Sequence, residues 1–257
     1  MKKTYTLLVL SLLLLISCRD DDSIDSETPV NATFNFSHHW DDTPVTNSDF
    51  NDLKFTNAHG ELLSIERLRY LISYVVFTET SGQTILLDGY NLVDVTNQTN
   101  LSYTPTNKIV TGTYRNVSFV FGFNNEKNIE GAYPDLNTAS WNVPMMLGGG
   151  YHYMQLDGKF KNNANETQGY NYHAIRANDN AGENPTFPKD TYIQVDLGEV
   201  TINTDVVFDI SMNIAEWFKN PNNWDLNEYN QMLMPNSTAQ ILIHENGQNV
   251  FTLEGIN

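Results

Sequence analysis

The sequence predicts an all-β domain, either an antiparallel sandwich or a barrel-like sheet, with a few short peripheral helices. Short runs rich in Val, Ile, Tyr, Phe and Thr recur along the chain, clusters of Asn, Gly and Asp separate them, and few segments carry helix signals. The chain has one cysteine, so no disulfide can form within it. Burial of apolar side chains and sheet hydrogen bonds must therefore stabilise the domain.

The expected strands follow one another at the spacing of a sandwich. They are 32–36, 68–78, 83–87, 90–95, 118–123, 151–160, 170–175, 191–197, 200–202 and 206–212. Helix signals occur at two places. The segment from Asn213 to Pro221 opens with a cap residue and closes with proline, and the segment 236–247 opens with Asn and closes with Asn-Gly. We expect both helices at the edges of the β core.

The first 17 residues indicate a secretory signal. Lys2 and Lys3 precede an apolar run from about Leu7 to Ile16, which is shorter than the roughly 20 residues that a membrane-spanning helix needs. The tetrapeptide Leu-Ile-Ser-Cys that ends at Cys18 resembles a bacterial lipobox, which implies cleavage before Cys18 and attachment of lipid to its sulfur. Lipidation also explains an unpaired cysteine in an exported protein.

Residues 18–31 are acidic, polar and without apolar periodicity, which is typical of a solvated tether. Residues 32–257 contain no linker-like segment or charge block, so we expect one folded domain there. Acidic residues directly after a lipidated cysteine resemble the signal that sends lipoproteins of some Gram-negative bacteria to the cell surface. We therefore expect an outer-membrane lipoprotein exposed at the surface, with the periplasmic face as the alternative.

The charge of the chain argues against nucleic acid as a partner. Removal of residues 1–17 takes away two of the 14 Lys and Arg residues and leaves all 31 Asp and Glu residues. Nucleic-acid binding depends on basic side chains. The sequence also contains no G-x-S-x-G, H-E-x-x-H or P-loop motif and offers no nucleophile with a matching base, so we expect no enzymatic activity.

The histidines are the most informative side chains. Alternation along the first strand places His38 and Trp40 on its apolar face, and His39 on the opposite face. In the strand 151–160, His152 and Met154 share a face, and His173 lies on the strand 170–175.

Three inward histidines from separate strands, beside methionine and tryptophan, predict a soft nitrogen and sulfur environment that suits copper, especially Cu(I). Two other interpretations remain open. Each histidine can be a core residue bonded to a backbone carbonyl, and the tyrosines beside His152 and His173 can form an aromatic wall for a glycan or peptide. His59 is interpreted as a turn residue. His244 lies near the end of the last helix, where the helix dipole favours a cationic ring. Neither is expected to bind metal.

Several segments, in order along the chain, are similar to those of the MbnP-like copper-binding family. Among them are FNFSHHWDDTPV, GTYRNVSFVFGFN, GGGYHYMQLDGKF, YNYHA and VDLGEVTINTDVVFDISMNIAEWF. The resemblance implies an exported β-rich domain that binds copper through histidines. In some members a tryptophan is oxidised to kynurenine by a partner di-haem peroxidase.

Residue by residue, the resemblance implies that His173 is a ligand and that His38 or His39 supplies another. Trp40 is the nearest candidate for a modified tryptophan, and Trp141 is the second. Many relatives carry tryptophans before the Gly-Tyr strand, where this chain has Pro-Met-Met-Leu-Gly-Gly-Gly at 144–150.

The sequence as a whole predicts a lipid-anchored extracytoplasmic protein that acts in copper acquisition or handling. Its expected partners are the membrane, through the lipid anchor, and a di-haem peroxidase or an outer-membrane transporter. The alternative is a surface lipoprotein that binds a glycan or protein through aromatic loops. The candidate copper ligands are His38, His39, His152 and His173, with Trp40 and Met154 as further ligands or modified residues.

Overall fold

The computed structural model describes residues 28–182 and 184–257. The expected signal segment 1–17 and the lipidation site Cys18 lie outside the described residues. Within the described ranges, no helix has the length and apolar character needed to cross a membrane. The folded domain begins before residue 32, because β1 (Pro29–Val30), which the sequence assigns to the tether, pairs with β9 (Ile109–Val110).

Eight strands form the larger sheet, and their printed pairings are antiparallel. The strands are β4 (Phe55–Thr56), β5 (Leu62–Leu63), β6 (Arg67–Glu79), β7 (Thr84–Asp94), β10 (Gly112–Phe121), β11 (Met154–Lys161), β12 (Thr167–Ala174) and β13 (Ile193–Ile202). At one end of β11, Met154 pairs with Tyr70 of β6 on one side and with Ala174 of β12 on the other.

The second sheet contains five strands. These are β2 (Ala32–Trp40), β3 (Thr43–Pro44), β8 (Ser102–Tyr103), β14 (Val206–Asn213) and β15 (Phe251–Ile256). Strands β2 and β14 pair in parallel, from Ala32 opposite Val206 to His39 opposite Asn213. The predicted antiparallel arrangement does not hold for this pair. Parallel neighbours need a long crossover, and here the chain between them builds the larger sheet.

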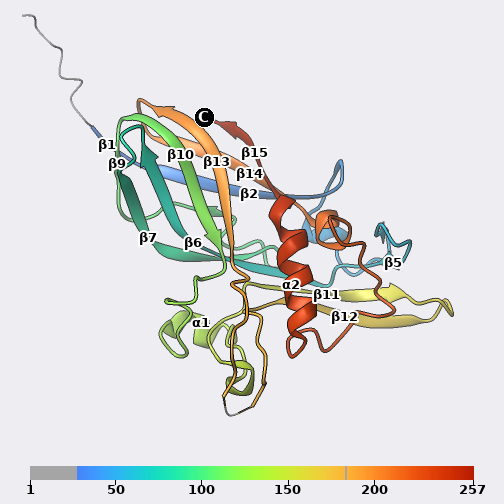
Figure 1. The fold of residues 1–257 in the computed structure, drawn as a ribbon. Coiled ribbons are helices and arrows are strands. Elements are labelled where there is room, and N and C mark those ends of the chain that lie inside the picture. The colour runs from blue at the N-terminus through green and yellow to red at the C-terminus, as the bar shows by residue number, and fades with distance from the viewer. Residues whose placement is uncertain (1–27, 183) are drawn as a thin grey trace, which may run out of the picture.

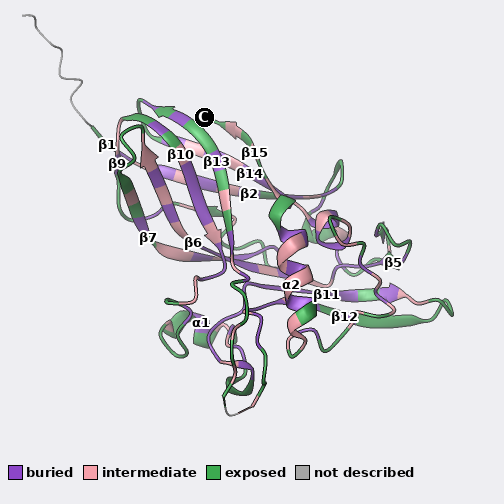
Figure 2. Ribbon diagram, in the orientation of Figure 1, coloured by how far each residue is buried: buried purple, intermediate pink, exposed green. Residues whose placement is uncertain are grey.

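Aromatic side chains fill the space between the two sheets, and Figure 2 shows the alternation of buried and exposed residues along the strands. Phe36 of β2 packs edge-on against Phe119 of β10, with ring centroids 6.0 Å apart. Phe208 of β14 stacks on Phe34 at 4.9 Å and contacts Phe77 of the larger sheet at 6.1 Å. Contacts between the inner faces of two sheets define a sandwich, so the predicted fold class is confirmed.

The strand predictions fail mainly at glycines. The segments 83–87 and 90–95 form one strand, β7, and the segments 191–197 and 200–202 form one strand, β13. Gly89 and Gly198 lie inside these strands with φ of +132° and +85°. Such glycines read as strand ends in a sequence, but a strand can continue through them where its register is irregular. Strand β15 and the two-residue strands are not among the predicted ones.

The helices are short and peripheral, as predicted. They are α1 (Pro134–Thr138), α2 (Ser237–Asn246) and the 3₁₀ helices η1 (Asn47–Asp49), η2 (Met145–Leu147), η3 (Ile214–Phe218) and η4 (Gly247–Asn249). The two predicted helix starts are confirmed. The Asn213 side chain accepts a hydrogen bond from the backbone N–H of Ala215, and that of Asn236 accepts one from Ala239.

The β11–β12 hairpin projects beyond the sandwich, with α2 beside its base (Figure 1). Gln240 of α2 joins the helix to the end of β12. Its Nε2 donates to the carbonyl oxygen of His173 at 2.9 Å, and its Oε1 accepts from the backbone N–H of Ile175 at 2.8 Å. Gln240 is buried, so both bonds are shielded from water. The end of β12, where His173 lies, is thereby held in place.

Candidate metal centre

His152 and His173 lie against each other at the base of the β11–β12 hairpin. Their ring centroids are 5.3 Å apart and the ring planes cross at 83°. His152 is 4 % exposed, and the His173 side chain is 12 % exposed. The antiparallel register explains the contact, because Met154 pairs with Ala174 and Gln155 pairs with His173. The chain just before β11 therefore passes the end of β12.

One nitrogen of each ring is already hydrogen-bonded. Nδ1 of His152 donates to the carbonyl oxygen of Trp141 at 2.9 Å. Nε2 of His173 donates to Oδ1 of Asp157 at 2.9 Å. A carbonyl or an ionised carboxylate can only accept, so in the neutral form of either ring the contact fixes its tautomer. In that form the lone pairs belong to the remaining nitrogens, Nε2 of His152 and Nδ1 of His173.

Those two remaining nitrogens are buried and have no hydrogen-bond partner. A buried polar atom without a partner costs about 1–3 kcal/mol, so two of them on rings in contact are unfavourable for the metal-free protein. A metal ion that accepts both lone pairs would remove this cost. The donor set fits a copper ion, since neutral imidazole is a good ligand for it.

Asp157 anchors the His173 ring within a network of hydrogen bonds. Its carboxylate also accepts from Nε of Arg67 and from Nδ2 of Asn171, each at 2.5 Å. Burial alone would raise the pKa of Asp157, but the hydrogen bonds from His173, Asn171 and Arg67 outweigh it and hold the pKa below its usual value. Asp157 is therefore ionised, and it orients His173 as a carboxylate commonly orients a metal-binding histidine.

Burial keeps His152 neutral. Loss of solvation is the largest effect, the nearby His173 adds to it, and together they lower the pKa of His152 from 6.5 to about 3. A protonated ring would have no free lone pair. The structure therefore keeps His152 in the form that a metal requires.

The position of His152 corrects a detail of the sequence interpretation. Strand β11 begins at Met154, so His152 lies in the irregular chain before the strand rather than on one of its faces. A run of three glycines precedes it. Gly150 has φ of +80°, and a Cβ there would lie 2.5 Å from Oδ1 of Asn128. Only glycine fits this position, because of both the left-handed backbone and the close approach of Asn128.

A cavity of about 520 Å³ opens onto His173. Three methionines, Met146, Met232 and Met234, lie among its lining residues. Two of them are strongly exposed, Met146 at 61 % and Met232 at 76 %. Thioethers are soft ligands that favour Cu(I), and this cavity connects His173 with solvent.

The structure places His38 and His39 in other environments. Nε2 of His38 is 2.9 Å from the hydroxyl of Tyr70 in the sandwich core. Burial, with a smaller effect of His39, lowers the pKa of His38 to about 3. His39 is half-buried, with Nδ1 bonded to the Asp41 carbonyl and Nε2 3.2 Å from Oγ of Ser211. The structure thus brings His152 and His173 together and gives His38 a hydroxyl partner.

The other two candidate side chains belong to the core. Trp40 stacks on Phe55 with ring centroids 5.0 Å apart. Met154 is fully buried in the main hydrophobic cluster. Trp141 is the tryptophan beside the histidine pair, with its ring 5.6 Å from that of His152. Its indole N–H is buried without a partner, and the Arg69 guanidinium lies 5.0 Å from its ring.

The tyrosines beside the two histidines do not form an exposed aromatic wall. Tyr151, Tyr153 and Tyr172 are fully buried. His244 also differs from expectation, since burial is the largest effect on its ring and lowers its pKa, so the helix dipole does not make it cationic. His59 lies in a turn as predicted, between β4 and β5.

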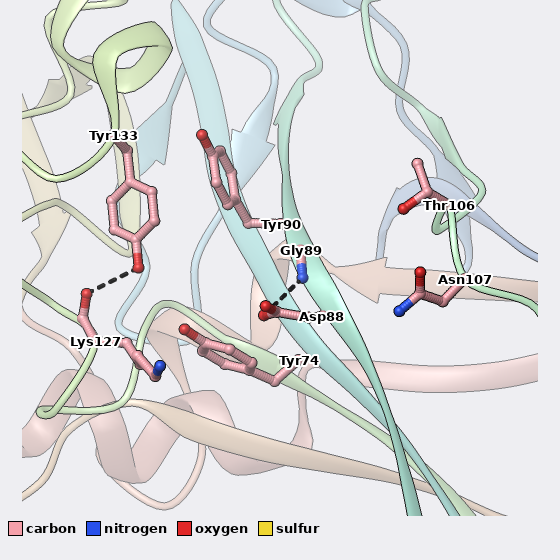
Figure 3. Close-up of a pocket in the computed structure, with 8 residues that line it drawn as sticks. All are labelled: Tyr74, Asp88, Gly89, Tyr90, Thr106, Asn107, Lys127 and Tyr133. Atoms are coloured by element: carbon pink, nitrogen blue, oxygen red, sulfur yellow. Dashed lines mark hydrogen bonds between the residues drawn. The ribbon is translucent and has the colours of Figure 1, made fainter.

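A different aromatic surface lies on the outer side of β6 and β7. Figure 3 shows Tyr74, Tyr90 and Tyr133 around a pocket of about 510 Å³ that also contains Asp88 and Lys127. Tyr74 has φ of +47° at an irregularity in the pairing of β6 with β7. Such bulges re-aim a side chain. The pocket therefore combines three half-exposed tyrosine rings with a carboxylate, from Asp88, and an amine, from Lys127.

The fold and the site define a class of protein, an all-β sandwich with a buried histidine pair at the base of a projecting hairpin. The sequence profile of the MbnP family matches residues 29–237, so the chain belongs to the MbnP family and the predicted membership is confirmed. Among solved structures, MbnP from Methylosinus trichosporium is similar over 90 % of this chain and 99 % of that chain. Its TM-score is 0.51 and its sequence identity 12 %, which shows a shared fold. No curated protein matches this chain.

Proposed function

We propose that this protein binds copper between His152 and His173 and acts in copper acquisition or handling. The observation that carries the proposal is the pair of buried, unpartnered ring nitrogens on two histidines in contact. Membership of the MbnP family, which is associated with copper, supports the choice of metal.

The surroundings of the pair favour Cu(I). Cu(I) accepts a low coordination number, which two imidazole ligands can provide. Soft thioethers line the cavity that opens onto His173. When bound, the copper would act as a soft Lewis acid. The protein keeps His152 neutral, and Asp157 orients His173 through Nε2. The acidic surface of the chain attracts cations from solution.

Attachment to a membrane through lipid on Cys18 is part of the same proposal. The supporting features are the signal segment, the Leu-Ile-Ser-Cys tetrapeptide and the acidic residues that follow it. An outer-membrane lipoprotein at the cell surface, or on the periplasmic face, is placed to capture or pass on copper outside the cytoplasm. Its partners would be an outer-membrane transporter or a di-haem peroxidase, for which Trp141 is the tryptophan beside the copper ligands.

The test measures the copper content of the purified protein and its X-ray absorption spectrum at the copper edge. Samples are loaded under reducing and oxidising conditions and then dialysed. We expect near-stoichiometric retention under reducing conditions and an absorption spectrum dominated by imidazole nitrogens at about 2 Å. Loss of all copper on dialysis under both conditions, or a spectrum without imidazole scattering, would refute the proposal.

A second candidate function is binding of a glycan at the pocket of Tyr74, Tyr90 and Tyr133. Half-exposed tyrosines beside a carboxylate and an amine are suited to stacking on sugar rings and to bonding hydroxyl groups. Quenching of tyrosine fluorescence by oligosaccharides measures this directly. We expect saturable quenching that Tyr74→Ala removes, and quenching that the variant leaves intact would exclude this pocket.

A further inference from the structure

A second cluster of metal-ligating side chains lies away from the histidine pair. It comprises His59 in the turn between β4 and β5, Glu61 just before β5, and Asp225 in the segment between η3 and α2. One ligand atom of each residue lies within 4.8 Å of the others. Nδ1 of His59 is 2.7 Å from Oε1 of Glu61 and 3.7 Å from Oδ1 of Asp225.

The turn that carries His59 and Glu61 is built for close approach. Oδ1 of Asn57 accepts the backbone N–H groups of Gly60 and Glu61, each at 2.9 Å. Nδ2 of Asn57 donates to the carbonyl oxygen of Trp224 at 3.2 Å, and Asn57 is buried. The turn therefore holds Asp225, the residue after Trp224, beside His59 and Glu61.

The ion pair with His59 leaves one oxygen of the Glu61 carboxylate without a partner. It is only 5 % exposed, and its Oε2 is buried without a hydrogen-bond partner. Its Oε1 already has both His59 and Nδ2 of Asn227, the latter at 2.8 Å. A buried carboxylate is costly unless paired. Within the described residues, His59 is the ion-pair partner of Glu61. The same imidazole ring also pairs with the Asp225 carboxylate, so one ring faces two carboxylates.

The donor set identifies the class of cation. One imidazole nitrogen and two carboxylate oxygens suit a borderline ion such as Zn²⁺, whereas Ca²⁺ and Mg²⁺ prefer oxygen alone. Around a tetrahedral zinc ion with ligands at about 2.0–2.1 Å, donor atoms lie about 3.3 Å apart. The two distances at Nδ1 of His59 fall on either side of that value. His59 is 37 % and Asp225 32 % exposed, so solvent can supply the fourth ligand.

We infer that His59, Glu61 and Asp225 bind a divalent zinc-class cation that fastens the 219–236 segment to the β4–β5 turn. On binding, the ion takes the place of the proton on Nδ1 of His59, and that proton is released to solvent. The same segment also supplies Met232 and Met234 to the cavity at His173. A cation at Asp225 therefore steadies one wall of the entrance to the histidine pair.

Titration of the chelator-stripped full-length protein with ZnCl₂, followed by calorimetry and thermal unfolding, tests the inference. The background carries His173→Ala, so that zinc at the histidine pair does not contribute. We expect binding of one zinc ion and a rise in the unfolding temperature. His59→Ala and Asp225→Asn should each weaken zinc binding at least about 100-fold, as expected for loss of one of three ligands.

Asp225→Asn keeps an oxygen that can accept from Asn227, so it tests the charge without removing the side chain. His39→Ala is the matched control for His59→Ala, because it removes a half-exposed histidine elsewhere, and it should bind zinc as the background does. Equal zinc affinity in the background and in both cluster variants would overturn the inference. So would an absence of binding, or a clear preference for CaCl₂ over ZnCl₂.

Discussion

Replacing either His152 or His173 by alanine is expected to abolish copper retention. Each ring supplies one of the two ligand nitrogens, so a single replacement leaves one imidazole ligand. The affinity for copper should fall by at least about 100-fold, because loss of a ligand costs more than loss of a hydrogen-bond partner of a ligand. The measurement is copper per protein by mass spectrometry after loading under reducing conditions and dialysis. Both variants should fall from near-stoichiometric copper to background.

Two further histidines provide the controls. His38→Gln replaces a buried histidine that bonds Tyr70, and His39→Ala replaces a half-buried one beside Ser211. Both should retain copper as the unaltered protein does. Circular dichroism confirms that each variant is folded. If His38→Gln loses copper while His152→Ala keeps it, the ligand assignment is wrong.

The metal-free protein is expected to lose stability as the pH falls from 7 to 5. His38 and His152 bind protons in the folded state only near pH 3, whereas the unfolded chain binds them near 6.5. The unfolded state therefore gains protons first, and the stability present above pH 6.5 is lost progressively down to about pH 3. At about 1.4 kcal/mol per pH unit, each histidine accounts for up to about 2 kcal/mol at pH 5.

Urea unfolding at pH 7, 6 and 5 measures this dependence. The free energy of unfolding should fall by up to about 4 kcal/mol for the two histidines together. His59 acts in the opposite direction, because its hydrogen bond with Glu61 raises its pKa in the folded state. His38→Gln should remove about half of the slope. An unchanged slope in that variant would show that His38 is not a neutral buried group in the folded protein.

The fold class follows from patterns that the sequence displays. Alternating apolar residues between turn-forming clusters predicted the sandwich, and the same alternation placed His38 and Trp40 in the core, where both are 7 % exposed. The errors arise where local signals are ambiguous. Gly89 and Gly198 resemble strand ends, because positive φ occurs both in turns and at irregularities within a strand.

The candidate site was predicted in part. The sequence selected His152 and His173 as possible ligands, but it grouped them with His38. Pairing of β11 with β12 brings the first two rings together. His38 instead meets Tyr70, whose hydroxyl occupies its Nε2. Which ring nitrogen already has a partner is a property of the packed structure, and no alternation pattern contains it.

By itself, the sequence determined the β-sandwich class, the two helix caps, the acidic surface and the family to which the chain belongs. These depend on residue type and local order. Only the tertiary structure decided which side chains meet. Glu61 and Asp225 are far apart in the sequence, yet both lie at His59 because the β4–β5 turn binds the segment at Trp224. Contacts of this kind depend on long-range packing, which local sequence patterns do not specify.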